Sequence, residues 1–343
     1  MRENADRDRR RVTISDVAQH AGVSTASASK VLRNAYGASP AMRARVQASM
    51  DELGYRPHGS ARGMRGRTFT IGVVLSDIEN PFYSLITDGL TSVVRAKSYD
   101  VFVSPSGFDA TVQQSVIEAM IDHQVDGLIL VSPLMRGNEL EAIAARVPVV
   151  VVGHHHRSQS FDTVAADDEL GSQLVVAHLA ELGHKDIAFV MHEDGRSDEA
   201  RPECHRLSGF VRAMERKGLG RNAAVVDSQW SLDGGRYAAR QLAAVDPPPT
   251  AVYAGADVVA LGIMNELWDN GGSVPSTYSL VGWDNSRTSS LGPIQLTTID
   301  QSGTRMGERA GELLLERIDG RRDSRHDLFQ PRLVIRRSTA PTK

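Results

Sequence analysis

The strongest constraint on the fold is an alternation of short apolar runs and amphipathic stretches that begins near residue 68. The apolar runs, rich in Val, Ile and Leu, occupy residues 69–75, 101–103, 127–131, 147–152, 187–191, 250–253 and 279–281. The amphipathic stretches between them include residues 85–97, 113–123 and 170–182. Near-continuous apolar strands separated by helices are typical of parallel sheets covered on both faces, and such sheets bind ligands at the carboxyl ends of their strands. We therefore predict an α/β body.

Charge is distributed unevenly between the two parts of the chain. Residues 1–67 contain 13 Lys and Arg against 6 Asp and Glu, whereas the remaining residues contain 26 against 36. A basic segment attached to an acidic body indicates a polyanion partner for that segment alone. A solvated arm without a partner would carry the same charge. The residue pattern inside the segment therefore has to distinguish a polyanion-binding segment from such an arm.

That pattern predicts three short helices. Thr13 is a typical N-cap and Asp16 completes a capping box, after which Gly22 ends the first helix. Ser24 is the N-cap of a second helix over residues 25–32. Ser39, followed by a proline, begins a third helix. A helix, a short Gly turn and a helix form the arrangement that lays the second helix in the major groove of DNA.

Composition bounds the remaining possibilities. A chain of 343 residues is expected to form two or three compact units. Cys204 is the only cysteine, so no intramolecular disulfide can form. No apolar stretch approaches the ~18 residues needed to span a bilayer, and the charged first residues do not resemble a secretory signal. We therefore expect a cytoplasmic protein with no membrane partner.

Several blocks of sequence resemble the lactose/galactose repressor family in order and spacing. In the basic segment these are VTISDVA (12–18), AGVS (21–24), SKVL (29–32) and ELGYRP (52–57). In the body they include NPFY (80–83), LGH (182–184), VGWDN (281–285) and LTTI (296–299). The family usually has Tyr at Ser15, Val at Ala28 and Arg at Lys30. Because Lys lacks the bidentate geometry of Arg, this difference implies a weaker reading of guanine.

The resemblance implies a domain organisation. Residues 1–11 would be a flexible basic arm, 12–56 a helix-turn-helix DNA-binding domain and 57–67 a hinge helix or plain linker. Residues 68–343 would form an effector-binding and dimerisation domain like the periplasmic sugar-binding proteins. One lobe would take about 68–167 and 300–331, and the other about 168–299 and 332–343. Gly59, Gly63 and Gly66 weaken the hinge helix, so we expect it to order only on DNA.

The resemblance also implies a DNA site and an effector site. The DNA partner would be a double-stranded, pseudo-palindromic operator read by a homodimer, with Ala61 and Met64 in the minor groove. The predicted DNA-binding residues are Thr13, Ser15, Ser24, Thr25, Ala26, Ser27, Ser29, Lys30, Asn34, Tyr55, Ala61 and Met64.

The effector would be a sugar or sugar derivative bound in the cleft between the lobes. Phe82 and Trp230 would be aromatic walls, and Arg206 and Asp284 would bond hydroxyl groups. The predicted effector-binding residues are Asp77, Phe82, Tyr83, His154, Arg206, Trp230, Asp257, Asp284 and Gln301. Gly153-His154 and Ala256 replace polar residues that are common in the family, so a non-sugar effector stays open.

Other functions fit the sequence less well. The run His154-His155-His156 lacks metal-ligand spacing and is expected to be a polar loop. Asp167 and Asp168 are explained by the start of a helix. There is no Gly-rich phosphate loop and no G-x-S-x-G elbow, so we predict no cofactor, no metal and no enzyme activity. A transporter's solute-binding protein and a regulator controlled by a protein partner are the alternatives.

Overall fold

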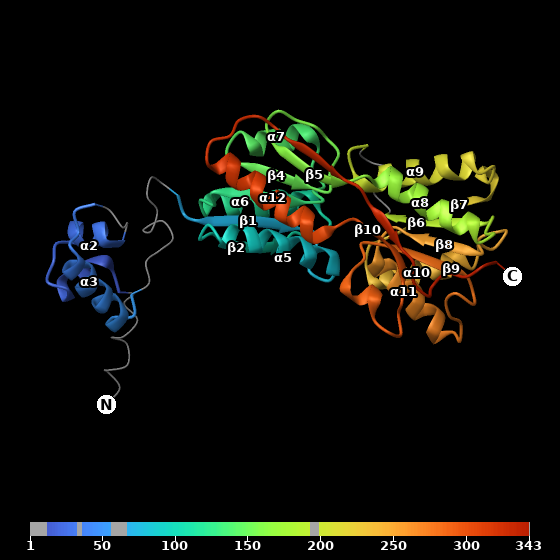
Figure 1. Cartoon of the computed structure of the whole chain (residues 1–343), viewed down its shortest axis with the longest axis horizontal. Helices are drawn as coiled ribbons and strands as arrows, with labels where there is room; N and C mark the ends of the chain where they lie inside the picture. Colours follow the sequence, from blue (N-terminus) through green and yellow to red (C-terminus); the bar gives the residue numbers. More distant parts are fainter. Residues whose placement is uncertain (1–11, 33–35, 56–66, 193–198, 343) are drawn as a thin grey trace. The chain divides into compact units, whose positions relative to one another are not determined.

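The computed structural model describes residues 12–32, 36–55, 67–192 and 199–342. The chain divides into two compact units (Figure 1). The first, the head, extends to residue 70 and includes residues 124–126, and the second, the body, contains the rest. Among the described residues, no helix is long and apolar enough to cross a membrane.

The head contains three helices, α1 (Ile14–His20), α2 (Thr25–Leu32) and α3 (Pro40–Glu52). Thr13 and Asp16 form the predicted capping box, with the Thr13 backbone N–H donating to Asp16 Oδ2 at 2.7 Å. The predicted N-cap of α3 is also confirmed, because the Ser39 hydroxyl accepts from the backbone of the third helical residue. These helices enclose a small apolar core made of Val17, Ala18, Ala21, Ala28, Val46 and Met50.

Two six-stranded sheets form the centre of the body. The first sheet has the order β11-β5-β4-β3-β1-β2 and the second has the order β12-β10-β9-β8-β6-β7. Every pairing recorded between described strands is parallel except β10 with β12. The strands of the first sheet are β1 (Thr70–Leu75), β2 (Asp100–Pro105), β3 (Gly127–Val131), β4 (Val149–Val152), β5 (Asp162–Ala166) and β11 (His326–Phe329). Those of the second are β6 (Ile187–His192), β7 (Ala223–Ser228), β8 (Ala251–Ala254), β9 (Ser279–Trp283), β10 (Thr297–Asp300) and β12 (Arg332–Val334).

Helices cover both sheets (Figure 1). With the first sheet lie α5 (Pro81–Arg95), α6 (Ala110–Asp122), α7 (Gly137–Ala144) and α12 (Gly303–Ile318). With the second lie α8 (Asp168–Glu181), α9 (Pro202–Arg216), α10 (Leu232–Leu242) and α11 (Asp257–Asp269). Short 3₁₀ turns occupy Gly220–Asn222 and Arg287–Ser290. Helix α12 packs along α5 and against β3, β4 and β5.

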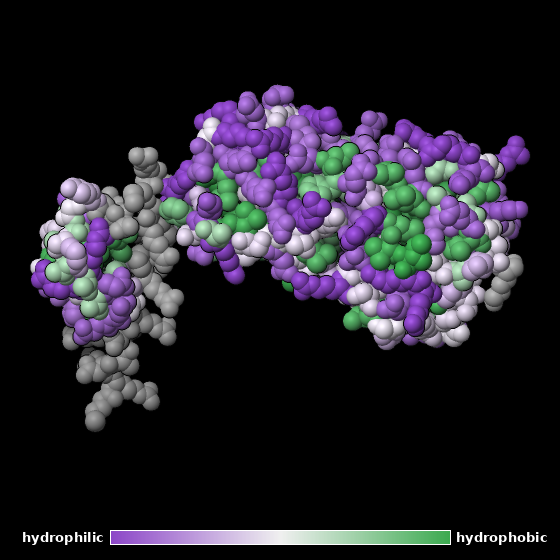
Figure 2. Space-filling model, viewed as in Figure 1, coloured by the Kyte–Doolittle hydropathy of each residue, from purple (hydrophilic) through white to green (hydrophobic). Residues whose placement is uncertain are grey.

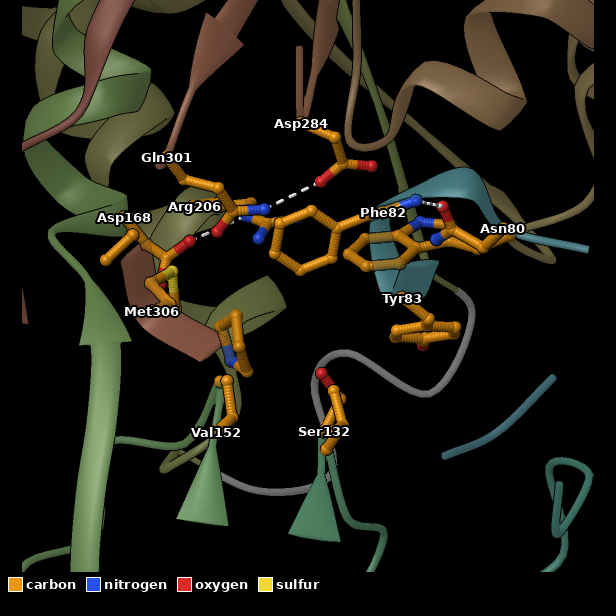
Figure 3. A pocket seen from close by; sticks show the side chains of 15 residues that line it. Asn80, Phe82, Tyr83, Ser132, Val152, Asp168, Arg206, Asp284, Gln301 and Met306 are labelled. Carbon is orange, nitrogen blue, oxygen red and sulfur yellow. Dashed lines mark hydrogen bonds and ion pairs between the residues drawn. The ribbon is translucent and has the colours of Figure 1, made fainter. Parts of the chain in front are cut away.

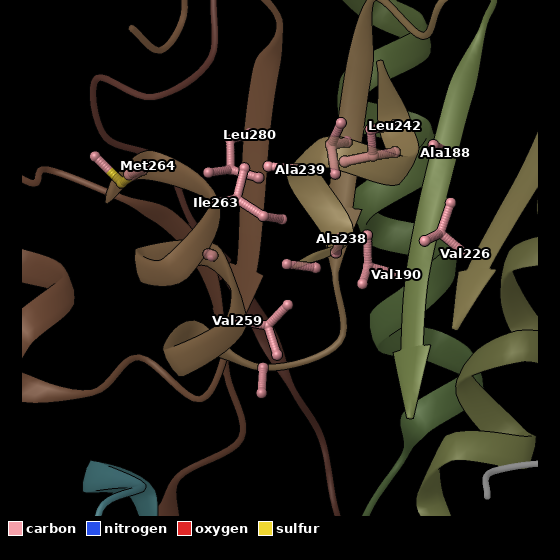
Figure 4. Packing of buried hydrophobic residues seen from close by; sticks show 14 of the residues in the cluster. Ala188, Val190, Val226, Ala238, Ala239, Leu242, Val259, Ile263, Met264 and Leu280 are labelled. Atoms are coloured by element: carbon pink, nitrogen blue, oxygen red, sulfur yellow. The ribbon is translucent and has the colours of Figure 1, made fainter. Parts of the chain in front are cut away.

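Side-chain alternation shows why the second sheet needs helices on both faces. Ala188 and Val190 of β6 join an apolar cluster with α10 and α11, part of which is shown in Figure 4. Ile187 and Phe189 point the other way and join a cluster with α8 and α9. A strand buried on both faces has no polar alternation, which is why it reads as a continuous apolar run.

Among the described strands, the apolar-run criterion finds seven and misses five, namely β5, β7, β10, β11 and β12. Two of the missed strands show the reason. Strand β5 begins with a buried Asp162, whose charge is balanced by Arg317 and Arg321 from the distant end of the chain. Strand β7 lies at a sheet edge and is only partly buried. A charged first residue and a half-exposed edge both remove the continuous apolar signal.

Candidate functional site

A cavity lies in the body where the carboxyl ends of strands from both sheets meet (Figure 3). Val152 ends β4 and Ser132 follows β3, whereas Asp284 and Gln301 follow β9 and β10 of the second sheet on the opposite side. The cavity, called the pocket below, is lined by Asn80, Phe82, Tyr83, Val131, Ser132, Val152, Gly153, Ala166, Asp168, Pro202, Arg206, Trp230, Asp284, Gln301 and Met306. Its place matches the general rule for ligands of parallel sheets.

Phe82 forms one aromatic wall because the start of α5 fixes it. The Asn80 side chain caps this helix by accepting from the Phe82 backbone N–H at 3.0 Å. On the other side, a Cβ atom at Gly303 would lie only 2.8 Å from the Phe82 ring. The ring is therefore held between a capped helix start and a glycine that leaves room for it.

Arg206 is the cation of the pocket, and its charge is already paired. Its Nε donates to Asp168 Oδ1 at 2.7 Å and its Nη1 donates to the Gly255 carbonyl at 2.7 Å. The guanidinium carbon lies 5.0 Å from the ring centroid of Trp230 and 4.2 Å from that of Trp283. These contacts hold the guanidinium plane rigidly, and the paired carboxylate cancels its charge.

Asp168 stays ionised despite complete burial. Burial acts to raise its pKa, but Arg206 and a hydrogen bond from His155 outweigh this effect and hold the pKa below the ordinary value. The second carboxylate oxygen of Asp168 accepts from His155 Nε2 at 2.7 Å. A carboxylate between two donors keeps its negative charge in the low-dielectric interior.

Asp284 shows the opposite behaviour. Burial raises its pKa well above the ordinary value, and the nearby charge of Asp257 raises it further. Gln301 Nε2 donates to Asp284 Oδ1 at 2.6 Å, while Oδ2 has no hydrogen-bond partner among the described residues. Burial likewise raises the pKa of Asp257 to about 6, against the effect of hydrogen bonds from Thr298 and Ser286. Burial and the Asp257 charge therefore favour the protonated form of Asp284, in which the carboxyl group can donate to a ligand oxygen.

Strained backbone surrounds the pocket. Asp284 has φ of 125°, Ser132 has φ of 47° and Ser302, next to Gln301, has φ of 63°. Non-glycine residues rarely adopt such values, and they gather at ligand sites where the surrounding structure enforces them.

The pocket brings together six of the nine predicted effector residues: Phe82, Tyr83, Arg206, Trp230, Asp284 and Gln301. The other three lie elsewhere. Asp77 accepts from the backbone N–H groups of Glu79 and Asn80 in the loop before α5. Asp257 lies behind Asp284 and bonds Thr298, and the buried His154 packs near His156.

Sequence reasoning missed Asp168 as a pocket residue. The start of α8 explains only Asp167, whose side chain accepts from the Leu170 backbone at 2.9 Å. Asp168 instead points to Arg206 and lines the pocket. The doubled carboxylate was the available signal, since one carboxylate is sufficient to cap a helix.

In the head, Ser15, Ser24, Thr25, Ala26 and Lys30 are exposed. Thr13 is engaged in its capping box, and Ser24 accepts from the Ser27 backbone N–H at 3.1 Å. Ser29 is half-buried on α2, and Tyr55 packs against the head core. Predictions for Asn34, Ala61, Met64 and the hinge fall outside the described residues.

The histidines of the run 154–156 have different partners. His155 bonds Asp168, and His156 lies 3.9 Å from a Glu141 oxygen. In the part of the chain that the structure describes, no group of three or more His, Cys, Asp or Glu side chains is arranged to hold a metal ion.

Comparison with known proteins matches both units. Residues 13–58 match the family model of bacterial regulatory proteins of the lacI family, and residues 176–339 match the periplasmic binding protein-like domain. The HTH-type transcriptional repressor PurR of Vibrio campbellii is 33% identical over 331 residues, which cover 94% of this chain and 97% of that protein.

Solved structures are similar over most of the chain. The lac repressor dimer bound to operator and the anti-inducer ONPF has a TM-score of 0.78 at 27% identity, covering 96% of this chain and all of that one. A LacI family transcriptional regulator from Enterococcus faecium with bound ribose has a TM-score of 0.70 at 27% identity, covering 80% of this chain and all of that one.

Proposed function

The chain belongs to the lacI family of bacterial regulatory proteins, and from this premise we propose that it is a dimeric repressor with an uncharged, carbohydrate-like effector. Its heads would bind the two halves of a pseudo-palindromic operator, and the effector would occupy the pocket of the body. The pocket is the observation that supports the effector part of this proposal. Aromatic walls and strained strand ends surround Arg206, whose charge is paired with Asp168.

The chemistry of α2 supports the DNA half. Thr25, Ala26 and Lys30 are exposed, while Ala28 on the same helix is completely buried in the head core. Short side chains allow the helix to approach base edges closely, and the Lys30 ammonium can donate to guanine O6 or N7. The excess of basic residues in the first 67 positions would add phosphate contacts that position the head.

The charge state of the pocket supports an uncharged effector. Among the described lining residues, Arg206 is the cation, and Asp168 neutralises it at 2.7 Å. A phosphate or carboxylate ligand would therefore find no uncompensated positive charge and would face Asp168 directly. The Trp230 indole N–H has no hydrogen-bond partner among the described residues, and the protonated form of Asp284, which burial favours, would offer a second donor. Hydroxyl and ring oxygens of a sugar can accept from both.

Exposed apolar side chains on the body support the dimer. Phe102, at the edge strand β2, is 56% exposed, and Leu291, after the turn at Arg287–Ser290, is 54% exposed. Figure 2 shows apolar residues in several places on the visible surface of the body. An edge strand with exposed apolar side chains is a surface on which another chain can pack, and we infer that a second copy covers it.

Selection from a random duplex library with the full chain tests the DNA half. We expect enrichment of a pseudo-palindrome whose affinity falls steeply with salt. Lys30→Ala should relax the preference within each half-site, whereas Lys217→Ala, an exposed lysine of the body, should leave it unchanged. Affinity for the selected site no better than for random duplex would refute the regulator.

Titration calorimetry tests the effector half with matched ligands. D-ribose and other uncharged sugars should include a binder, and its phosphate ester should bind at least tenfold more weakly. Specific DNA binding without a response to any sugar would favour control by a protein partner. Sugar binding without specific DNA binding would favour a solute-binding protein. Sedimentation of the full chain would test the dimer.

A further inference from the structure

The connection that follows β4 reaches from the first sheet to helices of the second. His155 lies in this connection, and its backbone N–H donates to the Ala200 carbonyl at 2.7 Å, just before α9. Its Nε2 donates to Asp168 at the start of α8, and its ring lies 3.9 Å from the ring of His205 in α9, between centroids. One side chain therefore joins an element of the first sheet to two helices of the second.

The same carboxylate connects His155 to the pocket. Asp168 Oδ2 accepts from His155 and Asp168 Oδ1 accepts from Arg206 Nε, both at 2.7 Å. The side chains are 15%, 2% and 5% exposed for His155, Asp168 and Arg206. Short charge-assisted bonds shielded from water are strong and directional, so the position of His155 constrains the carboxylate and the carboxylate constrains the guanidinium.

We propose that His155 is a positioning residue that fixes Arg206 in the pocket through Asp168 and ties this arrangement to the approach of the two sheets. Val152, the last residue of β4, and Gly153, the first residue of this connection, both line the pocket. A movement of the first sheet away from α8 and α9 would withdraw His155 from Asp168. Asp168 would then lose one of its two donors, and Arg206 would lose its fixed orientation.

A role of His155 in effector binding rests on the proposed function. The hydrogen bond from His155 to Asp168 does not depend on it. The bonds among His155, Asp168 and Arg206 join groups of this chain alone. An experiment on the chain without added effector can therefore succeed or fail whatever the effector proves to be.

Nitrogen–proton correlation spectra of the protein with isotope-labelled arginine report on the Arg206 Nε–H group. A buried Nε–H that donates to a carboxylate exchanges slowly with water and gives a resolved signal, which Arg206→Lys identifies by its loss. Arg317 Nε donates to Asp162 at 2.8 Å and is an internal reference for an intact fold. Its side chain is 9% exposed.

Three variants decide the question. His155→Leu keeps the bulk of the ring but removes the donor, and we expect the Arg206 signal to move and its exchange to accelerate at least tenfold. His155→Gln places an amide N–H where Nε2 lies, and it should restore the wild-type signal. His156→Leu is the matched control, because His156 lies in the same loop as His155 but faces Glu141 of α7. The Arg317 signal should be unchanged in all three.

Two results would overturn the proposal. One is an unchanged Arg206 signal in His155→Leu, because the donor would then be irrelevant to Arg206. The other is an altered signal in His155→Gln equal to that in His155→Leu, because ring packing rather than hydrogen bonding would then be responsible.

Discussion

Removing the carboxylate of Asp168 should damage the protein more than removing its partner Arg206. In Asp168→Ala the guanidinium, 5% exposed, would remain buried with only the Gly255 carbonyl as a direct acceptor. In Arg206→Leu the remaining carboxylate would still accept from His155. The two variants break the same ion pair but leave very different groups behind.

The magnitude follows from the burial of both groups. Breaking a buried pair by removing one partner typically costs about 3–5 kcal/mol, because an uncompensated charge stays in the interior. A retained hydrogen bond to a charged group is worth about 1.5–3 kcal/mol. We therefore expect Asp168→Ala to lose roughly 3–5 kcal/mol and Arg206→Leu to lose less by about 1.5–3 kcal/mol. At about 2–4 °C per kcal/mol, the larger loss lowers the Tm of the body by roughly 6–20 °C.

Scanning calorimetry of the full chain measures both values. Asp88→Ala is the matched control, since Asp88 and Arg287 form an ion pair whose side chains are 58% and 78% exposed, and such pairs contribute about 0–1 kcal/mol. The double variant Asp168→Leu/Arg206→Leu removes both charges and should be more stable than Asp168→Ala. A loss in Arg206→Leu as large as in Asp168→Ala, or a double variant no better than Asp168→Ala, would refute the reasoning.

Three further predictions concern the head, the body core and pH. Thr13→Ala removes the side-chain cap of α1 and should lower the stability of that helix by about 1 kcal/mol. Its backbone amides should then exchange with solvent about fivefold faster in the full chain, and unchanged exchange would contradict the cap. Gly307→Ala places a Cβ against the carbonyl oxygen of Ile86, and urea unfolding should show a loss of about 1–3 kcal/mol or more. Burial raises the folded-state pKa of Asp257 from 3.8 to about 6, so its contribution to stability is complete below the unfolded value and is lost as pH rises through the folded one. The stability of the wild type relative to Asp257→Asn should accordingly decline across that window, and a constant difference in urea midpoints would contradict it.

The sequence predicts the head in detail because its signals are local. A cap such as Thr13 and its partner Asp16 are three residues apart, and the inward positions of each helix repeat within one or two turns. Ser39 before Pro40 marks the start of α3 for the same reason. Nothing distant in the chain has to be known to place these residues.

The partners of buried charges cannot be predicted from the local sequence. Asp162 at the start of β5 is tolerated because Arg317 and Arg321, more than 150 positions later, donate to it. His155 and Asp168 belong to different elements, and their bond becomes visible only when α8 and α9 are placed beside the loop after β4. The resemblance to a family identified Arg206 and Asp284 but could not show which groups compensate each of them.

That compensation determines what the pocket can bind. Asp168 and Asp284 are both completely buried carboxyl groups of one cavity, yet the pKa of Asp168 is held low by Arg206 and His155 whereas that of Asp284 is raised by burial and Asp257. Asp168 is held ionised by its donors, whereas burial favours the protonated form of Asp284. With the indole N–H of Trp230, a protonated Asp284 would give the pocket donors without net charge, which fits the uncharged oxygens of the proposed effector better than a phosphate or an ammonium group. An arginine in a binding site therefore predicts an anionic ligand only when no carboxylate has already paired with it.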